Sequence, residues 1–143
     1  MGESSTPLEI AELTIRSRMD ELPRVTALLD ELGERHALPP AAISMHLVLD
    51  EIVSNIVKYA YDDDAIHAIR IALEITRDTI KAEVDDDGRA FDPLSVAEGD
   101  TPRSLSDLEI GGEGIRLVRR LMSEVHYARI GGHNRLTLIK RFS

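Results

Sequence analysis

The sequence predicts a two-layer α/β sandwich in which helices cover one face of a five-stranded sheet. Two observations lead to this prediction. Apolar residues alternate with period two in five segments and follow a helical period in three. The order of these segments is strand, helix, helix, strand, strand, helix, strand, strand, which leaves the helices to form a second layer over the sheet. Since a chain of 143 residues can bury a substantial core, we expect a single domain over residues 1–143.

The first strand and the first helix precede a double-proline break. Apolar residues alternate over residues 8–16, with a one-residue slip at Ala11 and Glu12 that predicts a bulge. A helix is expected over residues 20–36, where apolar residues recur at helical spacing and Asp20 can cap the first turn.

The longest helical pattern follows Pro39 and Pro40 and extends to Tyr61. A second stripe on this helix carries a carboxylate, an amide and an ammonium group at helical spacing. On spacing alone, a solvated helix face is the better explanation of that stripe. Its side-chain pairs would each stabilise the helix by roughly 0.2–0.5 kcal/mol. The apolar stripe predicted to be buried is Leu49, Val53, Ile56 and Ala60, and the polar stripe is Glu51, Asn55 and Lys58.

Two antiparallel strands are predicted over residues 69–76 and 80–86, joined by a tight turn at residues 77–78. The alternation of the second strand places Asp86 on the same face as the apolar Val84. A carboxylate on a buried face is unfavourable without a partner. On the pattern alone, a strand that has already ended, or a cap for the following loop, is equally compatible with this aspartate.

A long segment without periodicity, residues 92–112, predicts a functional lid. The glycine-rich residues 111–114 lead from it into a helix over residues 115–122. Glycines at a helix start allow close approach to phosphate, although such a cluster is more often a flexible connection. The chain closes with a hairpin of two strands over residues 125–130 and 135–142.

Composition narrows the classes of function. A net charge of −9 argues against a surface that follows a nucleic-acid backbone. The chain has no cysteine, which excludes disulfides and thiolate nucleophiles, and its five histidines lack metal-ligand spacing. The start resembles no signal peptide and no window approaches the roughly 20 apolar residues of a membrane span, so we expect a cytoplasmic protein without membrane contact.

Three segments combine in one order and at characteristic intervals. They are LDEIVSNIVKYAY in the longest helix, DDGRAFDP at a strand end, and GGEGIRLVRRLMSEV after the long loop. Over nearly its whole length the chain resembles the GHKL ATPase superfamily, and within it the anti-sigma factor serine kinases of the RsbW-like family. The resemblance implies a Bergerat-type ATP-binding fold, with a mixed, mainly antiparallel five-stranded sheet and helices on one face.

The resemblance assigns roles to individual residues. Glu51 would be the general base, and Asn55 would coordinate Mg²⁺ bridging the phosphates of ATP. Lys58 matches a lysine of the histidine-kinase form of this motif and would reach a phosphate. Asp86 would accept a hydrogen bond from the adenine amino group, and Gly88 would let the backbone pass close to the base.

The same resemblance extends into the loop and the next helix. Gly112 and Gly114 would hinge the lid and offer N–H groups to the phosphates, and Arg103 would be a lid cation for the γ-phosphate. Ala90 stands where the family's nucleotide-binding motif usually has its second glycine, and its small side chain keeps it in that motif. Glu113 places a negative charge in the phosphate-binding turn, which opposes ATP unless the side chain points to solvent.

As a whole, the resemblance implies an ATP-dependent protein serine/threonine kinase that uses ATP/ADP and Mg²⁺ and forms a homodimer. Its implied partners are a sigma factor, which it would sequester, and a STAS-type anti-sigma factor antagonist, whose serine it would phosphorylate. One alternative is a regulatory module whose protein interface is gated by nucleotide, with little or no kinase activity. A histidine-kinase ATPase domain separated from a larger protein is a weaker alternative, because a strand precedes the first helix and the lid is short.

Overall fold

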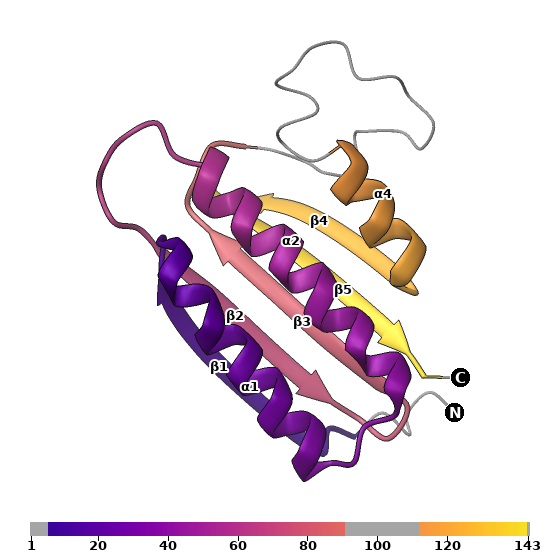
Figure 1. The fold of residues 1–143 in the computed structure, drawn as a ribbon. Coiled ribbons are helices and arrows are strands. Elements are labelled where there is room, and N and C mark those ends of the chain that lie inside the picture. The colour runs from indigo at the N-terminus through magenta and orange to yellow at the C-terminus, as the bar shows by residue number, and fades with distance from the viewer. Residues whose placement is uncertain (1–5, 91–111, 143) are drawn as a thin grey trace.

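The computed structural model describes residues 6–90 and 112–142, with the backbone alone for residues 112–115. It contains five strands, three α-helices and two short 3₁₀ turns (Figure 1). The strands are β1 (Glu9–Arg16), β2 (Ala68–Ile75), β3 (Thr79–Asp86), β4 (Glu124–Ile130) and β5 (His133–Arg141). The helices are α1 (Leu22–Arg35), α2 (Ile43–Tyr59) and α4 (Gly112–Leu121), and the 3₁₀ turns are η2 (Met19–Glu21) and η3 (Pro40–Ala42).

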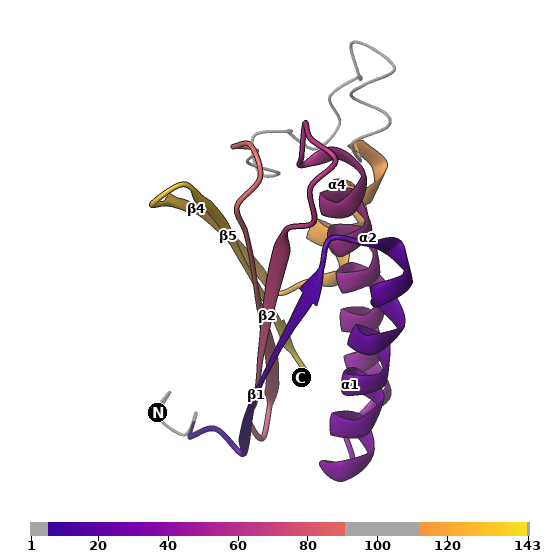
Figure 2. The ribbon, with the colours of Figure 1, turned by 90° about the vertical axis from the view of Figure 1, so that its left-hand side faces the viewer.

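The strands form one sheet in the order β1-β2-β3-β5-β4. All four neighbouring pairs are antiparallel. Figure 2 shows the three helices on one face of this sheet. The predicted two-layer fold is therefore confirmed, and the described sheet has no parallel pair.

The predicted bulge in the first strand is wrong. The register between β1 and β2 is uninterrupted from Glu9, opposite Ile75, to Arg16, opposite Ala68. Without a slip, Ile10 lies on the face away from the helices and is 64% exposed. An edge strand tolerates this apolar side chain on its outer face, and the alternation in this segment therefore misled the prediction.

The first helix begins two residues later than predicted, and Asp20 does not cap it. The turn η2 precedes α1, and the Asp20 carboxylate pairs instead with Arg18. The neighbouring Glu21 is buried and accepts a hydrogen bond from the Arg16 backbone N–H at 2.8 Å. This bond joins the end of β1 to the start of α1.

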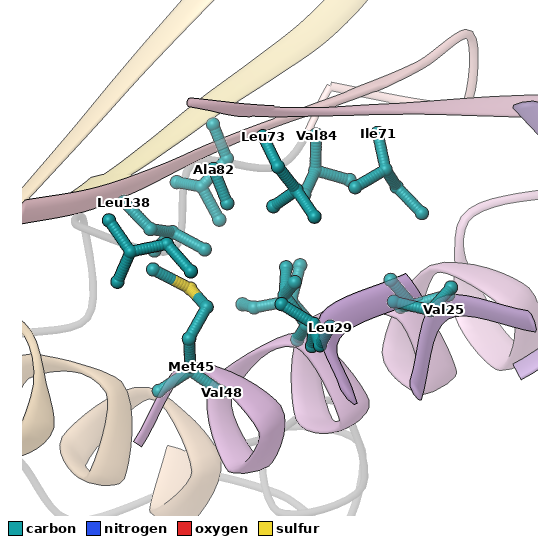
Figure 3. Close-up of a cluster of buried hydrophobic side chains, with 14 of the residues drawn as sticks. Val25, Leu29, Met45, Val48, Ile71, Leu73, Ala82, Val84 and Leu138 are labelled. Carbon is teal, nitrogen blue, oxygen red and sulfur yellow. The ribbon is translucent and has the colours of Figure 1, made fainter. Parts of the chain in front are cut away.

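The core lies between α1, α2 and the inner face of the sheet. Figure 3 shows side chains of the two helices pointing toward those of β2, β3 and β5. Helix α2 buries a broader face than the predicted stripe, because α1 and α4 flank it (Figure 1). Its buried apolar residues are Met45, Val48, Leu49, Ile52 and Val53, whereas Ile56 is only partly buried.

Residues Pro40–Tyr59, with a mean hydropathy of 1.2, are long and apolar enough to cross a membrane by length and composition. This finding corrects the expectation that no window approaches that limit. In the fold, the apolar face of this segment packs on the sheet and on α1. The segment is the central core helix of the described domain.

The C-terminal hairpin completes the sheet, and α4 completes the helix layer. The turn between β4 and β5 is formed by Gly131 and Gly132, whose φ angles of 56° and 81° favour glycine. Lys140 of β5 donates from Nζ to the Leu121 carbonyl at 2.9 Å, which satisfies a free carbonyl at the end of α4. This bond fixes α4 against the sheet.

Candidate functional site

The end of β3 meets the C-terminal end of α2 at a glycine. A Cβ atom at Gly88 would lie 2.6 Å from the Ala60 Cβ and 2.7 Å from the Ala60 carbonyl oxygen. The next residue, Arg89, donates its backbone N–H to that same carbonyl at 3.0 Å. Only glycine fits this contact without moving the backbone of one of the two segments.

Asp86, the last residue of β3, has a buried side chain that is 4% exposed. Its inward orientation agrees with the predicted alternation. Its Oδ1 accepts hydrogen bonds from the Gly88 backbone N–H at 2.8 Å and from Asn134 Nδ2 at 3.1 Å. The residue therefore both ends the strand and caps the turn, and its Oδ2 has no hydrogen bond from the part of the chain described.

The surroundings of Asp86 act on its charge in opposite directions. Burial raises the pKa of the Asp86 carboxyl, and the neighbouring carboxylates of Asp85 and Asp87 raise it further. The hydrogen bonds from Asn134 and Gly88 lower the pKa, because they stabilise the charged form. A buried hydrogen-bond acceptor is thus fixed in position at this strand end.

Three further residues fix this strand end, and the sequence did not single them out. Asn134 Nδ2 also donates to the Arg89 carbonyl at 2.8 Å, and Tyr127 donates its hydroxyl to Asn134 Oδ1 at 2.5 Å. Arg129 donates from Nη1 to the Gly88 carbonyl at 2.8 Å. We call Asp86, Gly88, Asn134 and Tyr127 the strand-end cluster.

An aromatic pair lies on the other side of Asp86. The rings of Tyr61 and His67 stack with centroids 4.0 Å apart and an interplanar angle of 7°. His67 contacts Asp63 at 2.8 Å and Asp87 at 3.2 Å, and the bond to Asp63 raises its pKa. Burial raises the pKa of the Tyr61 hydroxyl, with Asp86 and Asp87 adding to the effect. Asp63 is therefore a partner of His67.

The polar stripe of α2, which we call the helix stripe, consists of Glu51, Asn55 and Lys58. Asn55 Nδ2 donates to Glu51 Oε2 at 3.0 Å, so the carboxylate and the amide share one helix face as predicted. Both side chains are partly exposed, and Lys58 is exposed. Asn55 lies five residues before Ala60, roughly 8 Å along the helix axis from the contact with Gly88.

The remaining predicted site residues are less fully described. Ala90 is exposed and is the last residue before the gap in the described chain. Gly112 and Gly114 form the first turn of α4, which packs on α2. Arg103 and the predicted lid, residues 92–112, lie outside the described residues except for Gly112.

Two comparisons identify the family. Residues 15–140 match the histidine kinase-like ATPase domain. The chain belongs to this family. It is also 37% identical over 95 residues to the serine/threonine-protein kinase BtrW of Bordetella bronchiseptica (strain ATCC BAA-588 / NCTC 13252 / RB50), across 66% of this chain and 67% of that protein.

Membership of the histidine kinase-like ATPase family confirms the suspected relationship and implies that the chain binds nucleotide. The strand-end cluster contains a buried acceptor, and the backbone N–H groups at the start of a helix such as α4 in general favour an anion. The helix stripe carries a carboxylate and an amide that bond to each other. The described part of the chain holds no group of three or more His, Cys, Asp or Glu side chains suited to a metal ion.

The helix stripe nevertheless fits a cation shared with a ligand. Asn55 uses its Nδ2 to donate to Glu51, which leaves its carbonyl oxygen, Oδ1, as a hard oxygen ligand. Mg²⁺ is usually held by one or two protein oxygens together with phosphate oxygens and water. A metal here would therefore depend on the nucleotide for most of its coordination.

Proposed function

We propose that this protein is an ATP-dependent protein serine/threonine kinase and anti-sigma factor, which phosphorylates a STAS-type anti-sigma factor antagonist. The observation that carries the proposal is the bond between Glu51 and Asn55 on the partly exposed helix stripe, within a domain of the ATPase family. A carboxylate next to an amide oxygen provides a base and a metal ligand on one side of a γ-phosphate. The kinase named BtrW, 37% identical over the aligned segment, supports the choice of chemistry.

In the proposed reaction the substrate serine oxygen attacks the γ-phosphorus as the bond from that phosphorus to the β-phosphate bridging oxygen breaks. Glu51 accepts the proton of the serine hydroxyl, and ADP leaves with the bridging oxygen. Asn55 orients the Glu51 carboxylate through their 3.0 Å hydrogen bond. Glu51 is partly exposed on α2.

Asn55 would hold Mg²⁺ through Oδ1, and the ion would supply neutralising charge as negative charge develops on the phosphates. Asp86 would accept a hydrogen bond from the adenine amino group through Oδ2, the oxygen without an intramolecular bond in the described chain. The phosphates would be contacted by Lys58, Gly112, Gly114 and Arg103. Ala90 would lie beside the adenine base. The net charge of −9 repels a phosphate, so these local hydrogen-bond donors and cations would have to hold it.

The remaining parts of the proposal concern the cell. We propose a cytoplasmic homodimer that sequesters a sigma factor and releases it when the antagonist binds. These partners follow from the sequence resemblance to the anti-sigma factor serine kinases. The sigma factor and the antagonist are the proteins to be recovered in a pulldown from the native host.

The test uses purified protein, Mg²⁺, γ-labelled ATP and a candidate STAS-type antagonist. The wild type should transfer label to a serine of the antagonist. Glu51→Ala should transfer it roughly 10²- to 10⁴-fold more slowly while still binding ATP, because a positioned base contributes about that factor. Asp50→Asn is the matched control, since Asp50 is an exposed neighbour on the same helix without an assigned role.

Equal transfer by Glu51→Ala and the wild type would show that Glu51 is not the base. ATP binding without transfer to any protein in a labelled lysate would instead support the nucleotide-gated binding module. Calorimetry with ATP distinguishes both from a purely structural domain, which should produce no heat of binding.

A further inference from the structure

His67 joins three segments at the end of the sheet where Asp86 lies. It immediately precedes β2, and its backbone N–H donates to Ser17 Oγ at 2.9 Å, just after β1. Its ring contacts Asp63, in the segment after α2, and Asp87, directly after β3. We call His67, Asp63 and Asp87 the histidine bridge. None of these three residues has a role in the proposed function.

The geometry of the histidine bridge fits the charged form of the ring. His67 Nε2 lies 2.8 Å from Asp63 Oδ1, and Nδ1 lies 3.2 Å from Asp87 Oδ1. Carboxylates only accept hydrogen bonds, and a neutral imidazole donates from one nitrogen alone. The imidazolium therefore donates to both carboxylates, whereas the neutral ring donates to one and faces the other with a lone pair.

The stacking of His67 on Tyr61 favours the same form. The two ring centroids are 4.0 Å apart and the rings are nearly parallel, at 7°. A cation is attracted to the face of a tyrosine ring more strongly than a neutral ring is. The His67 side chain is 19% exposed, so water screens its charge only in part. Protonation therefore strengthens both the stacking and the hydrogen bonds of the bridge.

The histidine bridge is one of two links between the segment after α2 and the turn after β3. The other link is the hydrogen bond from the Arg89 backbone N–H to the Ala60 carbonyl, at 3.0 Å. That backbone bond has no titratable group, whereas the link through His67 depends on a proton. Gly88, whose Cα packs against Ala60, lies between the two links in the sequence.

We propose that the histidine bridge holds the turn after β3 in its nucleotide-binding conformation while His67 is protonated, and releases it when the ring loses its proton. The protonated ring fixes Asp87, the residue between Asp86 and Gly88. Apparent affinity falls in proportion to the fraction of molecules in the binding conformation. This inference rests on the proposed function, in which Asp86 faces the nucleotide.

Charge acts in the same direction as the conformation. The protein has a net charge of −9, which repels an anionic nucleotide. An imidazolium between two carboxylates offsets part of that charge beside the site, and its deprotonation restores the repulsion. Both effects predict tighter binding of nucleotide on the acidic side of the His67 titration.

The groups that face His67 come from each element around it. The hydrogen bond to Asp63, after α2, raises the pKa of His67, burial lowers it, and the bond to Asp87, after β3, raises it again. Ser17 faces it from the end of β1 and carries no charge. Tyr61 is also neutral in this range, because burial raises the pKa of its hydroxyl. The bridge is therefore complete below the ordinary histidine pKa of about 6.5 and is lost as pH rises through the raised value.

The test compares His67→Gln with the wild type by calorimetry with ADP and Mg²⁺. Glutamine keeps one donor and takes up no proton. Because the phosphates of ADP titrate in the same range, the readout is the ratio of the two dissociation constants at a single pH. We expect the variant to bind about fivefold more weakly than the wild type at about pH 6, and equally within about twofold at about pH 8. A merely structural role of His67 would weaken binding equally at both values.

His126→Gln is the matched control, because His126 is exposed on β4 and also contacts a carboxylate, that of Glu124, at 2.9 Å. It should bind ADP like the wild type at both pH values. Protonation of Asp86 acts in the opposite sense, since it removes an acceptor in acid, and it is common to all three proteins.

A second measurement needs no nucleotide. In NMR spectra of the free wild type, the shift of the Gly88 amide should follow the titration of the His67 ring, and in His67→Gln it should stay constant over the same range. Asp87→Asn removes one of the two charges on the ring and should move both midpoints down. It decides the matter if circular dichroism shows His67→Gln to be unfolded.

A constant ratio of the two dissociation constants would overturn the proposal, as would a Gly88 amide whose shift ignores the His67 titration. A wild type that binds neither ADP nor ATP would instead overturn the proposed function, and the Gly88 amide would still report whether the bridge opens with pH. The two failures are therefore distinguishable.

Discussion

The strand-end cluster and the helix stripe differ in how firmly the fold holds them. Asp86 in the strand-end cluster is buried and accepts hydrogen bonds from Gly88 and Asn134, and Asn134 also bonds to Arg89 and Tyr127 within the described residues. In the helix stripe, Glu51 and Asn55 are joined by a hydrogen bond to each other, and the side chains of the stripe are partly or fully exposed. The strand-end cluster is therefore fixed by contacts with the rest of the fold, whereas the helix stripe is less constrained.

This difference has a physical reason. A purine base is flat and uncharged. A hydrogen-bond acceptor fixed in a buried position can distinguish the atoms on its edge. Phosphates are highly charged and bring a metal and water with them, so fewer preorganised protein groups are needed there. Under the proposed function, the strand-end cluster contacts the adenine base and the helix stripe takes part in phosphoryl transfer.

The largest effect is expected at Gly88. A Cβ in Gly88→Ala would lie 2.7 Å from the backbone oxygen of Ala60, which cannot move without distorting α2. We expect a loss of about 2–3 kcal/mol in the free energy of unfolding, measured by urea denaturation, together with loss of nucleotide binding. Gly33→Ala is the control, since nothing lies within 4 Å of its Cβ. That helical substitution should stabilise α1 by about 0.5–1 kcal/mol. Equal stabilities of the two variants would mean that the strand end is not rigidly packed.

Asp86→Asn should separate binding from stability. Its amide oxygen can keep the bonds from Gly88 and Asn134, but an NH₂ group then replaces Oδ2 and, under the proposed function, would face the adenine donor. We expect ATP affinity to fall roughly 10- to 100-fold by calorimetry. Exposed Asp64→Asn should bind like the wild type.

The same variant should alter the pH dependence of stability. Burial raises the pKa of Asp86, so its contribution to stability is greatest below its ordinary pKa of about 3.9 and is lost as pH rises through the raised value. Asp86→Asn lacks this loss. The difference in Tm between Asp86→Asn and the wild type should therefore shift in favour of the variant as pH rises from about 4 to 7. A constant difference would contradict the buried charge.

Lys58→Ala tests the helix stripe and should have a smaller effect. Lys58 is exposed in the last turn of α2, and exposed ion pairs contribute at most about 1 kcal/mol. ATP affinity should fall less than about fivefold. Lys81→Ala, on the outer sheet face, is the control. A tenfold or greater loss of ATP affinity for Lys58→Ala, but not for Lys81→Ala, would show that Lys58 contributes more to binding than an exposed side chain is expected to.

The smallest effect concerns the aromatic pair beside the strand-end cluster. Asp63→Asn removes the main cause of the raised pKa of His67, so the NMR titration midpoint of the His67 ring should move down. Since a raised histidine pKa stabilises the fold below about 6.5 and this contribution disappears as pH rises through the raised value, the variant should be less stable only on the acidic side. The His126 ring provides an internal reference. An unmoved His67 midpoint would assign the raised pKa to Asp87 instead.

The sequence predicted the elements whose signals are local. The alternation in β3 correctly placed Asp86 on the buried face, and the helical spacing placed Glu51 and Asn55 together. The same local logic failed at Ile10, because alternation does not say which strand lies at a sheet edge. The catalytic and ligand-binding roles of the site residues stay predictions.

By itself the sequence determined the order of the elements, the two-layer fold and, through its three motifs, the family. Only the tertiary structure brought Asn134 and Tyr127 to Asp86, because 48 residues separate Asn134 from Asp86 and the register of β3 with β5 decides their contact. The signal for Asn134 was its position in a predicted turn, where polar residues are ordinary. Periodicity reports which face a side chain takes, and the pairing of distant strands decides which side chains share that face.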